Sequence, residues 1–477
     1  MTTVQDIVAK LWSLCDVLRD DGITFHQYVN ELSYLLFLKM AEETKTERLL
    51  LKSCRWRDLV QRSHDPNEQY RHYLHMLDDL GTRGRGRVKQ IFANPTTFLH
   101  HPENLNTLVS QIDSIEWHAV NREGLGDIYE GVLQKNANEK KSGAGQYFTP
   151  RPLIECIINL VKPQPGETIL DPAVGTCGFF ILANAYLKNQ TAAPLGGSSD
   201  TAEKKQFFGV ELVRDTHRLA LMNAMLHSIE GGIVLGDSLA EDGVALPKAD
   251  LIITNPPFGS KKGAGRSMRS ELPFPTSNKQ LAFLQLIYCG LKPGGRAAVV
   301  LPDNVLFEEG TGAKIRADLL DKCNLHTLLR LPTGIFYAQG VKTNVLFFTR
   351  GTKQTGNTKR IWIYDLRANM PSFGKQTPLT HEHFAEFEKC FGKRFDGTSK
   401  RKDQGESGRF RSFNASEIAQ RNYRLDITWM KDESLESSDE LRDPLELANE
   451  VVGELETIIG DLREIVSLIE EEEGGKA

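Results

Sequence analysis

The chain has 477 residues, 40% of them hydrophobic and 25% charged, which is typical of a globular protein of two or three domains. No apolar run reaches the length of a membrane span, the start lacks the layout of a secretory signal, and the scattered cysteines form no C-x-x-C pair, so we expect a cytoplasmic protein without disulfides or a metal site. The net charge of -5 is unusual for a protein that binds nucleic acid alone, because lysine and arginine supply most of the affinity for phosphates.

Helical periodicity dominates the N-terminal part of the chain. In the run HQYVNELSYLLFLKMAEE, apolar residues recur at helix-like spacing, at Tyr28, Leu32, Leu35, Leu36 and Met40, and DIYEGVLQ repeats the pattern. We therefore predict an N-terminal helical domain over residues 1–140. The polar, glycine-bearing segment NANEKKSGAG indicates a linker or loop at its end.

Short apolar runs alternate with helical segments across the middle of the chain. The runs with the pattern of strands are ETILD, QFFGVEL, GIVLGD, ADLIITN, RAAVVLP, LHTLLRLP and TNVLFFTR. This alternation predicts an α/β domain over residues 141–400 with a doubly wound, mostly parallel, Rossmann-like sheet covered by helices on both faces. The last two runs are closely spaced and favour an antiparallel edge. Ligands of such a sheet bind at the carboxyl ends of the strands.

The C-terminal extension, residues 401–477, ends in a predicted helix. Its apolar residues follow at alternating four- and three-residue steps, at Val451, Leu455, Ile458, Leu462, Ile465 and Ile469. This is the pattern of a coiled-coil seam, which needs a second helix to pack against. The pattern leaves open whether that helix belongs to the same chain or to a partner.

Acidic residues follow three successive predicted strands. Asp171 ends ETILD and leads through PAVGTCG into a helix, and Gly175 and Gly178 let a ligand approach the backbone closely there. Glu211 ends the next strand, where nucleotide-binding folds place an acid on ribose hydroxyls. Asp237 ends the third strand and can accept a hydrogen bond from an adenine amine. Each acid alone is compatible with an ordinary strand end, but the three together favour a nucleotide-containing cofactor.

The segment ADLIITNPPFGS runs from a buried strand directly into Asn255, Pro256, Pro257 and Phe258. The exocyclic amine of adenine is a poor nucleophile because its lone pair is delocalised into the ring. If the Asn255 side-chain oxygen and the Pro256 carbonyl each accept an amine hydrogen, the nitrogen becomes more tetrahedral and can attack a methyl sulfonium in line. The rigid proline pair fixes the direction of that carbonyl. Phe258 offers a flat face on which a base swung out of the duplex can stack.

In this order, DPAVGTCGF, GVEL, GDSL and NPPF resemble the motifs of amino-methyltransferases that act on DNA adenine, and GQYFTPR resembles a signature of the modification (HsdM) subunit of type I restriction-modification systems. The resemblance covers nearly the whole chain. It implies an adenine-specific DNA methyltransferase that uses S-adenosylmethionine to methylate the N6 amine of a flipped-out adenine. It also implies which residues hold that cofactor: Gln146, Tyr147, Phe148, Thr149, Pro150, Arg151, Thr176, Cys177, Gly178 and Glu211. Cys177 is a mild departure, since the family commonly has a smaller residue there.

The resemblance further implies a set of partners. A separate specificity (HsdS) subunit chooses the DNA site, two modification subunits clasp it and the DNA, and a restriction and translocase subunit (HsdR) completes the complex. The negative net charge and the absence of a Walker or recognisable nuclease motif agree with this division of labour. The basic residues after the NPPF turn, at Lys261, Lys262, Arg266 and Arg269, either contact phosphates or are merely solvated, and we favour the contact.

Two other functions are compatible with part of the pattern. Enzymes that methylate a protein glutamine amide also use an NPP-aromatic turn, because an amide nitrogen has a similarly delocalised lone pair. The GQYFTPR segment, the large helical N-terminal region and the coiled-coil seam disfavour that function. A cofactor-binding scaffold that has lost catalysis is disfavoured by the intact turn from Asn255 to Phe258. The absence of a Pro-Cys pair disfavours methylation at C5 of cytosine.

Overall fold

The computed structural model describes residues 4–14, 25–117, 131, 149–191, 206–240, 243–258, 269–336, 341–371, 373 and 377–430. The chain divides into two compact units. The first unit comprises Met1–Ala144, Pro163–Ser238 and Gly243–Pro247, and the second comprises Gly145–Lys162, Leu239–Asp242 and Lys248–Ala477. These units are defined by contacts between residues and not by continuous stretches of sequence. The predicted domain borders near residues 140 and 400 stay predictions.

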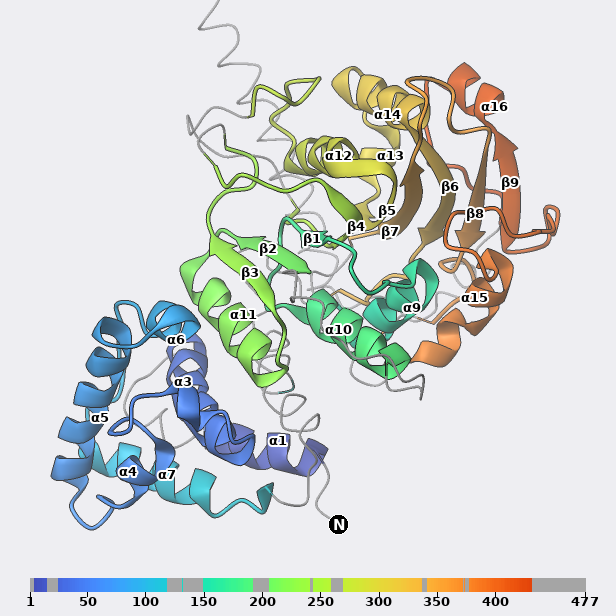
Figure 1. Ribbon diagram of the computed structural model, residues 1–477. Helices are drawn as coiled ribbons and strands as arrows, with labels where there is room; N and C mark the ends of the chain where they lie inside the picture. Colours follow the sequence, from blue (N-terminus) through green and yellow to red (C-terminus); the bar gives the residue numbers. More distant parts are fainter. Residues whose placement is uncertain are drawn as a thin grey trace, which may run out of the picture. The chain divides into compact units, whose positions relative to one another are not determined.

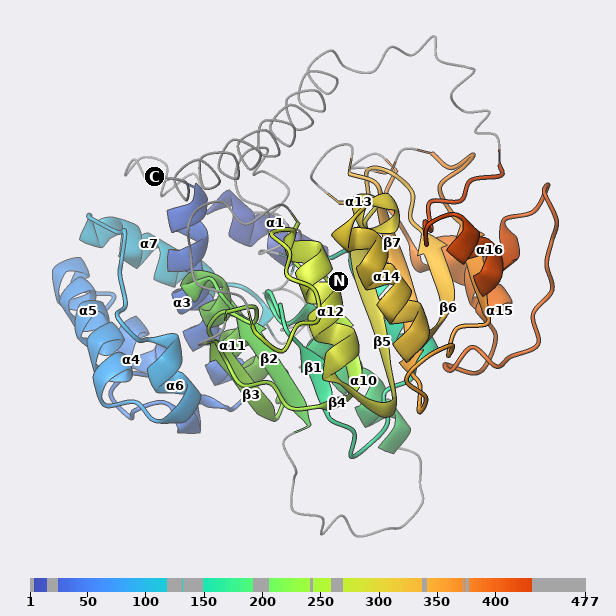
Figure 2. The same cartoon turned by 90° about the horizontal axis from the view of Figure 1, so that it is seen from above.

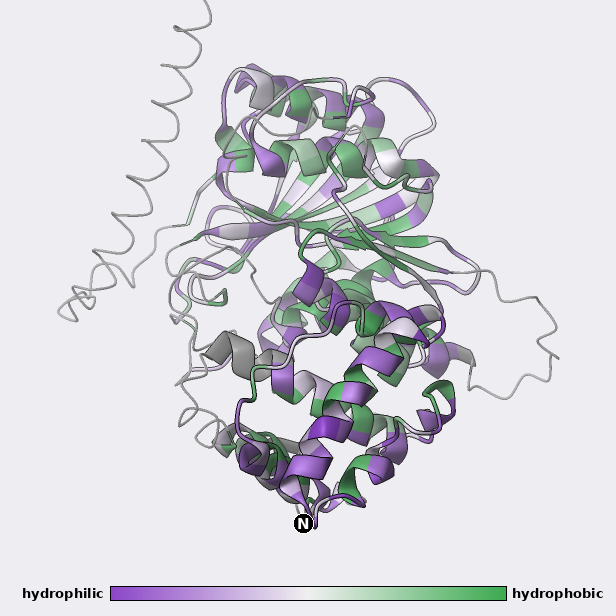
Figure 3. Ribbon diagram, turned by 90° about the vertical axis from the view of Figure 1, so that its left-hand side faces the viewer, coloured by the Kyte–Doolittle hydropathy of each residue, from purple (hydrophilic) through white to green (hydrophobic). Residues whose placement is uncertain are grey.

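Helices form the N-terminal part of the first unit (Figure 1). The amphipathic spacing seen in the sequence explains them. In α5, for example, Asp65 caps the first turn by accepting hydrogen bonds from the amides of Asn67 and Glu68, and Pro66 occupies the first helical position. Purple and green segments alternate along these helices in Figure 3, as expected of helices that bury one face. Their bounds are α1 Val4–Ser13, α3 Phe25–Glu43, η1 Glu47–Leu49, α4 Trp56–Val60, α5 Pro66–Thr82, α6 Gly86–Ile91 and α7 Pro102–Asp113.

Three parallel strands complete the first unit in the order β3-β2-β1. They are β1 Ile169–Asp171, β2 Phe207–Glu211 and β3 Gly231–Leu235, and they are joined through α10 Gly178–Thr191 and α11 Arg214–Leu226. Because the strands are parallel and in register, their carboxyl ends meet at one edge. Asp171 and Glu211 therefore lie at the same edge of the sheet.

Polar contacts join these strands to the N-terminal helices. The Arg87 guanidinium of α6 donates hydrogen bonds to the carbonyls of Ile229 (2.7 Å) and Gly231 (2.8 Å) at the start of β3. The Arg218 guanidinium of α11 lies 5.1 Å from the centre of the Tyr34 ring of α3. Strands β1 to β3 and the N-terminal helices thus pack together within the first unit.

The second unit contains six strands in the order β4-β5-β7-β6-β8-β9. The pairs β4·β5 and β6·β8 are parallel, and the pairs β5·β7, β6·β7 and β8·β9 are antiparallel. Helices α12 and α14 cover one face of these strands, and α9 covers the other (Figures 1 and 2). The bounds are α9 Arg151–Val161, β4 Ala249–Thr254, α12 Lys279–Gly290, β5 Leu291–Pro302, α13 Asn304–Phe307, α14 Thr311–Lys322, β6 Cys323–Arg330, β7 Thr343–Arg350, β8 Arg360–Asp365, η3 His381–Phe384, α15 Ala385–Phe391, β9 Phe410–Asn414 and α16 Ala415–Gln420.

The predicted α/β class with an N-terminal helical part is confirmed, and so is the antiparallel pairing of LHTLLRLP with TNVLFFTR, which form β6 and β7. The seven strands predicted become nine in the described residues, because β8 and β9 extend the second unit. These two short strands lie between polar segments, which hid them in the sequence. The predicted helix over residues 451–469 lies outside the described residues. No helix within the described ranges is long and apolar enough to cross a membrane.

Candidate active site

The loop between β1 and α10, residues 172–177, is fixed through its backbone amides. The Ala173 amide donates to the Asp171 carboxylate at 3.0 Å, and the Val174 amide donates to the Val210 carbonyl of β2 at 2.9 Å. The Gly175 amide donates to the Glu211 carboxylate at 3.1 Å. The loop is therefore tied to the ends of both neighbouring strands.

Two buried side chains fix the carbonyls of the same loop. The Asn223 side chain of α11 is 0% exposed and donates through Nδ2 to the Thr176 carbonyl at 2.8 Å. The Ser238 hydroxyl is also buried and donates to the Pro172 carbonyl at 2.6 Å. Because hydrogen bonds hold the carbonyls of Pro172 and Thr176, the loop has its shape before a ligand binds. Neither residue was predicted from the sequence, since Asn223 lies inside a helix and Ser238 follows the motif acid Asp237.

Two loop residues adopt positive φ angles. Gly175 has φ of 55°, and Cys177 has φ of 78°, a region that side chains rarely occupy. Open space surrounds the position of a Gly175 Cβ, so a glycine is required there by backbone conformation rather than by crowding. The Cys177 side chain is buried, which fits its interpretation as a small packing residue.

Glu211 is a buried acid at the end of β2. One carboxylate oxygen accepts the Gly175 amide, and the other accepts the Val213 amide at 2.8 Å. Burial raises the pKa of Glu211 above its ordinary value, although the backbone hydrogen bonds from Val213, Gly175 and Leu212 oppose that effect. The next side chain, Leu212, is 62% exposed, which is unusual for a leucine directly after a buried strand. The buried Glu211 carboxylate is therefore followed directly by the exposed apolar side chain of Leu212.

The NPPF turn lies at the carboxyl end of β4 in the second unit. Asn255 Nδ2 donates to the Thr149 hydroxyl at 3.0 Å. The other end of the same amide, Asn255 Oδ1, is buried and has no hydrogen-bond partner among the described residues. Thr149 thus orients the amide so that its acceptor oxygen remains available.

The aromatic residue of the turn contacts a second ring. Phe258 is half-buried, and its ring centre lies 6.4 Å from that of Phe336 at an interplanar angle of 73°. Phe336 follows β6 and is 3% exposed. An edge-on contact of this kind fixes the plane of Phe258 while it leaves a face of that ring uncovered by Phe336.

Two models of known protein families match the sequence of this chain. The model of the family "N-6 DNA Methylase" matches residues 120–439, and that of the "HsdM N-terminal domain" matches residues 7–115. The chain belongs to the N-6 DNA methylase family.

Relatives of known name agree along the whole chain. It is 50% identical to the type I restriction enzyme StySPI methylase subunit of Salmonella potsdam and 49% identical to the EcoKI methylase subunit of Escherichia coli K12, and each match covers 96% of this chain and 94% of the relative. The crystal structure of the EcoKI M protein is 44% identical, with a TM-score of 0.57 over 98% of this chain and 96% of that one. A putative type I modification subunit from Vibrio vulnificus YJ016 is 27% identical, with a TM-score of 0.70 over 92% of this chain and 99% of that one.

These findings confirm the resemblance drawn from the motifs. The chain is an adenine-specific DNA methyltransferase of the type I restriction enzyme methylase subunits. Methylation of a protein glutamine is not favoured.

The predicted site residues of this methylase fall into three groups. In the first unit lie Asp171, Gly175, Thr176, Cys177, Gly178, Glu211 and Asp237, around the loop 172–177 and the ends of β1 to β3. In the second unit lie Thr149, Pro150, Arg151, Asn255, Pro256, Pro257 and Phe258. Outside the described residues lie Gln146, Tyr147 and Phe148, as do Lys261, Lys262 and Arg266 of the basic loop.

The remaining basic residue of that loop, Arg269, has a protein partner. Its guanidinium forms an ion pair with Glu271 at 2.9 Å, and its side chain is 9% exposed. This observation disfavours the predicted phosphate contact for Arg269. No cluster of His, Cys, Asp and Glu suited to a metal ion occurs in the part of the chain that the structure describes.

Proposed function

We propose that this methylase transfers a methyl group from S-adenosylmethionine to the N6 amine of a flipped-out adenine, with the cofactor held by the first unit and the amine activated by the NPPF turn of the second. The observation that carries this proposal is the buried Asn255 Oδ1, which lacks a hydrogen-bond partner among the described residues although Nδ2 of the same amide is engaged. A buried acceptor without a donor costs about 1–3 kcal/mol. A donor from a bound adenine would remove that cost.

The first unit offers groups that suit a nucleoside with an amino-acid tail. Glu211 presents a carboxylate for ribose hydroxyls, and the exposed Leu212 presents an apolar surface for an adenine ring. The loop 172–177 is held by its neighbours, so it needs little reordering when a ligand binds. We assign Asp171, Gly175, Thr176, Cys177, Gly178 and Asp237 to this binding surface. On the motif resemblance we also assign to cofactor binding Gln146, Tyr147, Phe148, Thr149, Pro150 and Arg151.

The NPPF turn supplies acceptors for the amine hydrogens. Asn255 Oδ1 accepts one hydrogen and the Pro256 carbonyl accepts the other, which withdraws the nitrogen lone pair from the ring system of the base. S-adenosylmethionine supplies a methyl group on a positively charged sulfur. As the N–C bond forms and the S–C bond breaks, positive charge develops on the amine nitrogen, and the two acceptors stabilise that charge until one proton leaves to solvent. Phe258 stacks on the flipped base and sets its plane.

We further propose that the chain works in a complex. A specificity subunit supplies DNA recognition, two copies of this chain bind it, and a restriction subunit joins the full assembly. Support comes from the net charge of -5, which opposes unaided binding to phosphates. The predicted seam of the C-terminal helix, residues 451–469, suits docking onto a partner helix.

The test co-expresses the chain with its specificity subunit, supplies labelled S-adenosylmethionine and unmodified DNA, and identifies the labelled nucleoside. We expect N6-methyladenine from the wild-type complex. In the complex carrying Asn255→Ala we expect kcat to fall about a hundredfold to a thousandfold, because one preorganised acceptor is lost. Cofactor affinity should stay within about twofold of the wild type, since no cofactor-binding group has changed.

Three outcomes would contradict parts of the proposal. Label on protein instead of DNA would favour glutamine methylation. Full activity in the Asn255→Ala complex would remove Asn255 from the mechanism. Tight cofactor binding without methyl transfer by the wild-type complex would favour a scaffold that has lost catalysis.

A further inference from the structure

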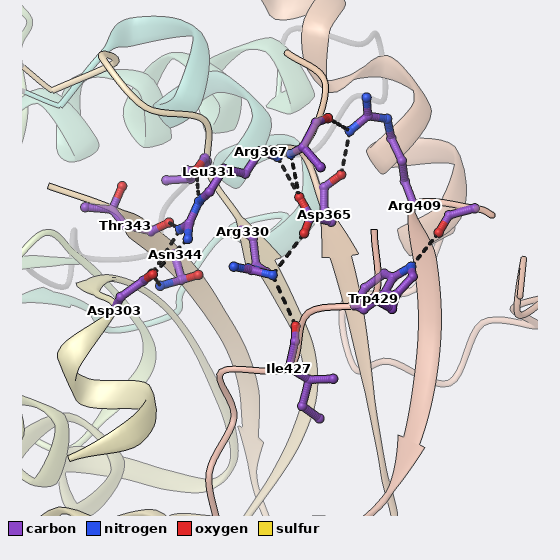
Figure 4. Close-up of polar contacts among 12 residues, drawn as sticks. Asp303, Arg330, Leu331, Thr343, Asn344, Asp365, Arg367, Arg409, Ile427 and Trp429 are labelled. Carbon is purple, nitrogen blue, oxygen red and sulfur yellow. Dashed lines mark hydrogen bonds and ion pairs between the residues drawn. The ribbon is translucent and has the colours of Figure 1, made fainter. Parts of the chain in front are cut away.

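One arginine, Arg367, connects the ends of three strands of the second unit. The Arg367 guanidinium donates to both carboxylate oxygens of Asp303, at 2.8 and 2.9 Å, directly after β5 (Figure 4). It also donates to the Leu331 carbonyl after β6 and to the Thr343 carbonyl at the start of β7, each at 3.0 Å. The planar shape of guanidinium permits this simultaneous contact, which a lysine ammonium does not reproduce.

The ion pair between Arg367 and Asp303 is electrostatically strong. The Arg367 side chain is 10% exposed, and Asp303 receives a further hydrogen bond from Asn344 Nδ2 at 2.7 Å. Burial alone would raise the pKa of Asp303, but the hydrogen bonds and charge of Arg367 hold that pKa below its ordinary value. A bidentate, partly desolvated ion pair of this kind resists displacement, because separating it leaves a charge without a partner.

The arginine holds both ends of the β6–β7 connection. Leu331 opens this connection and Thr343 closes it, and the Leu331 amide also donates to the Thr343 carbonyl at 3.0 Å. Phe336 lies five residues after Leu331 and makes the edge-on contact with Phe258 of the NPPF turn. The position of the Phe336 ring therefore depends on the segment that Arg367 anchors.

We propose that Arg367 is a positioning residue for methyl transfer: by joining Asp303, Leu331 and Thr343 it fixes the segment that carries Phe336, and Phe336 in turn fixes the plane of Phe258 against the target base. This inference rests on the function proposed above, in which Phe258 stacks on the flipped adenine. Arg367 itself touches neither the base nor the cofactor. Its effect is expected in the rate of the chemical step and not in cofactor affinity.

The same network contains a matched control. Arg409 also donates to backbone carbonyls, those of Asp365 at 2.9 Å and Ala368 at 2.7 Å (Figure 4) and that of Asn369 at 3.5 Å. These hydrogen bonds do not involve the β6–β7 connection. Replacing either arginine by lysine keeps the charge and removes the planar set of donors. Arg409→Lys removes contacts to the segment 365–369, which carries Arg367, but leaves in place the guanidinium that donates to Asp303, Leu331 and Thr343.

The experiment compares Arg367→Lys and Arg409→Lys, each in the complete complex with the specificity subunit and DNA. For Arg367→Lys we expect kcat to fall about tenfold to a hundredfold, as misplacement of a reacting group by about 1 Å can cost a hundredfold in rate. The Kd for S-adenosylmethionine should stay within about twofold. For Arg409→Lys we expect kcat within about threefold of the wild type. The thermal stability of this variant should fall by about as much as that of Arg367→Lys.

A double-mutant cycle with Phe336→Leu tests the route of the effect. If Arg367 acts through Phe336, Phe336→Leu alone should lower kcat by a similar factor, and the double variant should be no slower than the slower single variant. The inference would be overturned if the factors by which the two single substitutions lower kcat multiply in the double variant, or if kcat is unchanged in Arg367→Lys. Failure of the proposed function looks different, because the wild-type complex itself would then not form N6-methyladenine.

Discussion

The loop 172–177 and the NPPF turn are made rigid in opposite ways. The loop 172–177 is anchored by hydrogen bonds from groups distant in sequence, including the side chains of Asn223 and Ser238. The turn at Asn255 owes its rigidity to two prolines and one side-chain hydrogen bond from Asn255 to Thr149. It also retains a buried acceptor without a partner in the described chain. A ligand-binding loop profits from a fixed shape, whereas a catalytic turn needs an acceptor left ready for the transition state.

This comparison predicts that substitutions at the two sites separate binding from catalysis. A change at or beside the turn should lower kcat even when the cofactor is saturating. A change behind the loop should weaken cofactor binding first. The following predictions test that separation, beginning with the largest expected effect.

Among the residues that support the two sites, the largest effect is expected from Thr149→Val in the complex. Valine keeps the shape of threonine and removes the oxygen that accepts the hydrogen bond from Asn255 Nδ2. The amide then loses the group that orients it, and we expect kcat for adenine methylation to fall about tenfold to a hundredfold. Single-turnover methyl transfer under saturating cofactor measures the effect.

Thr149→Ser is the matched control, since serine keeps the hydroxyl. We expect it to restore kcat to within about threefold of the wild type. Loss of activity in Thr149→Ser comparable to that in Thr149→Val would show that the methyl group, and not the hydrogen bond, is what matters.

The next largest effect is expected from Asn223→Leu. Removal of the buried amide leaves the Thr176 carbonyl without its donor at the cofactor loop. A lost hydrogen bond that strands a buried partner costs about 1–3 kcal/mol. We expect about a tenfold higher Kd for S-adenosylmethionine, measured by isothermal titration calorimetry, which corresponds to about 1.4 kcal/mol.

A matched variant for this prediction is Asn184→Leu. Asn184 also donates through Nδ2 to a backbone carbonyl, that of His227 at 3.1 Å, but this contact lies away from the loop. The Kd should change less than about twofold in this variant. Equal losses of affinity in both variants would mean that Asn223 contributes to general stability only.

A pH effect is expected at Glu211. Its folded pKa is raised above the ordinary value of 4.5, so the folded state binds a proton more readily than the unfolded state. The contribution of Glu211 to stability therefore declines as pH rises through the window between 4.5 and the raised folded pKa, and is most favourable below it. Cofactor binding should show the opposite slope, because only the ionised carboxylate offers all its acceptor positions to ribose hydroxyls.

Glu211→Gln is the test of that pH effect. We expect the wild-type Kd for S-adenosylmethionine to weaken about threefold to tenfold as pH falls through the raised pKa, on the basis of about 1 kcal/mol for a hydrogen bond. The variant should bind more weakly at neutral pH and lose this pH dependence. An identical pH profile in the two proteins would assign the effect to another group.

The sequence predicted the positions of Asn255 and Glu211 at strand ends, but not the residues that hold these two side chains and the loop 172–177 in place. Asn255 and Glu211 follow apolar strands, and that position identifies them because the carboxyl ends of parallel strands form ligand sites. The residues that hold them are spread along the chain. Asn223 lies within a helix and Arg367 follows β8, a strand missed in the sequence, so only the fold brings them to their partners. Strands β8 and β9 escaped prediction for the same reason, because their pairing is set by neighbours distant in sequence.

The smallest effect is expected from Ser238→Ala. Its hydroxyl donates at 2.6 Å to the Pro172 carbonyl, at the start of the loop. The Asn223 side chain, in contrast, holds the Thr176 carbonyl near the end of the loop. The substitution removes one neutral hydrogen bond worth about 1 kcal/mol, and part of that loss falls on stability rather than on binding. We therefore expect the Kd for S-adenosylmethionine to rise about twofold to threefold. A larger rise than in Asn223→Leu would mean that the start of the loop, and not its Thr176 end, governs cofactor binding.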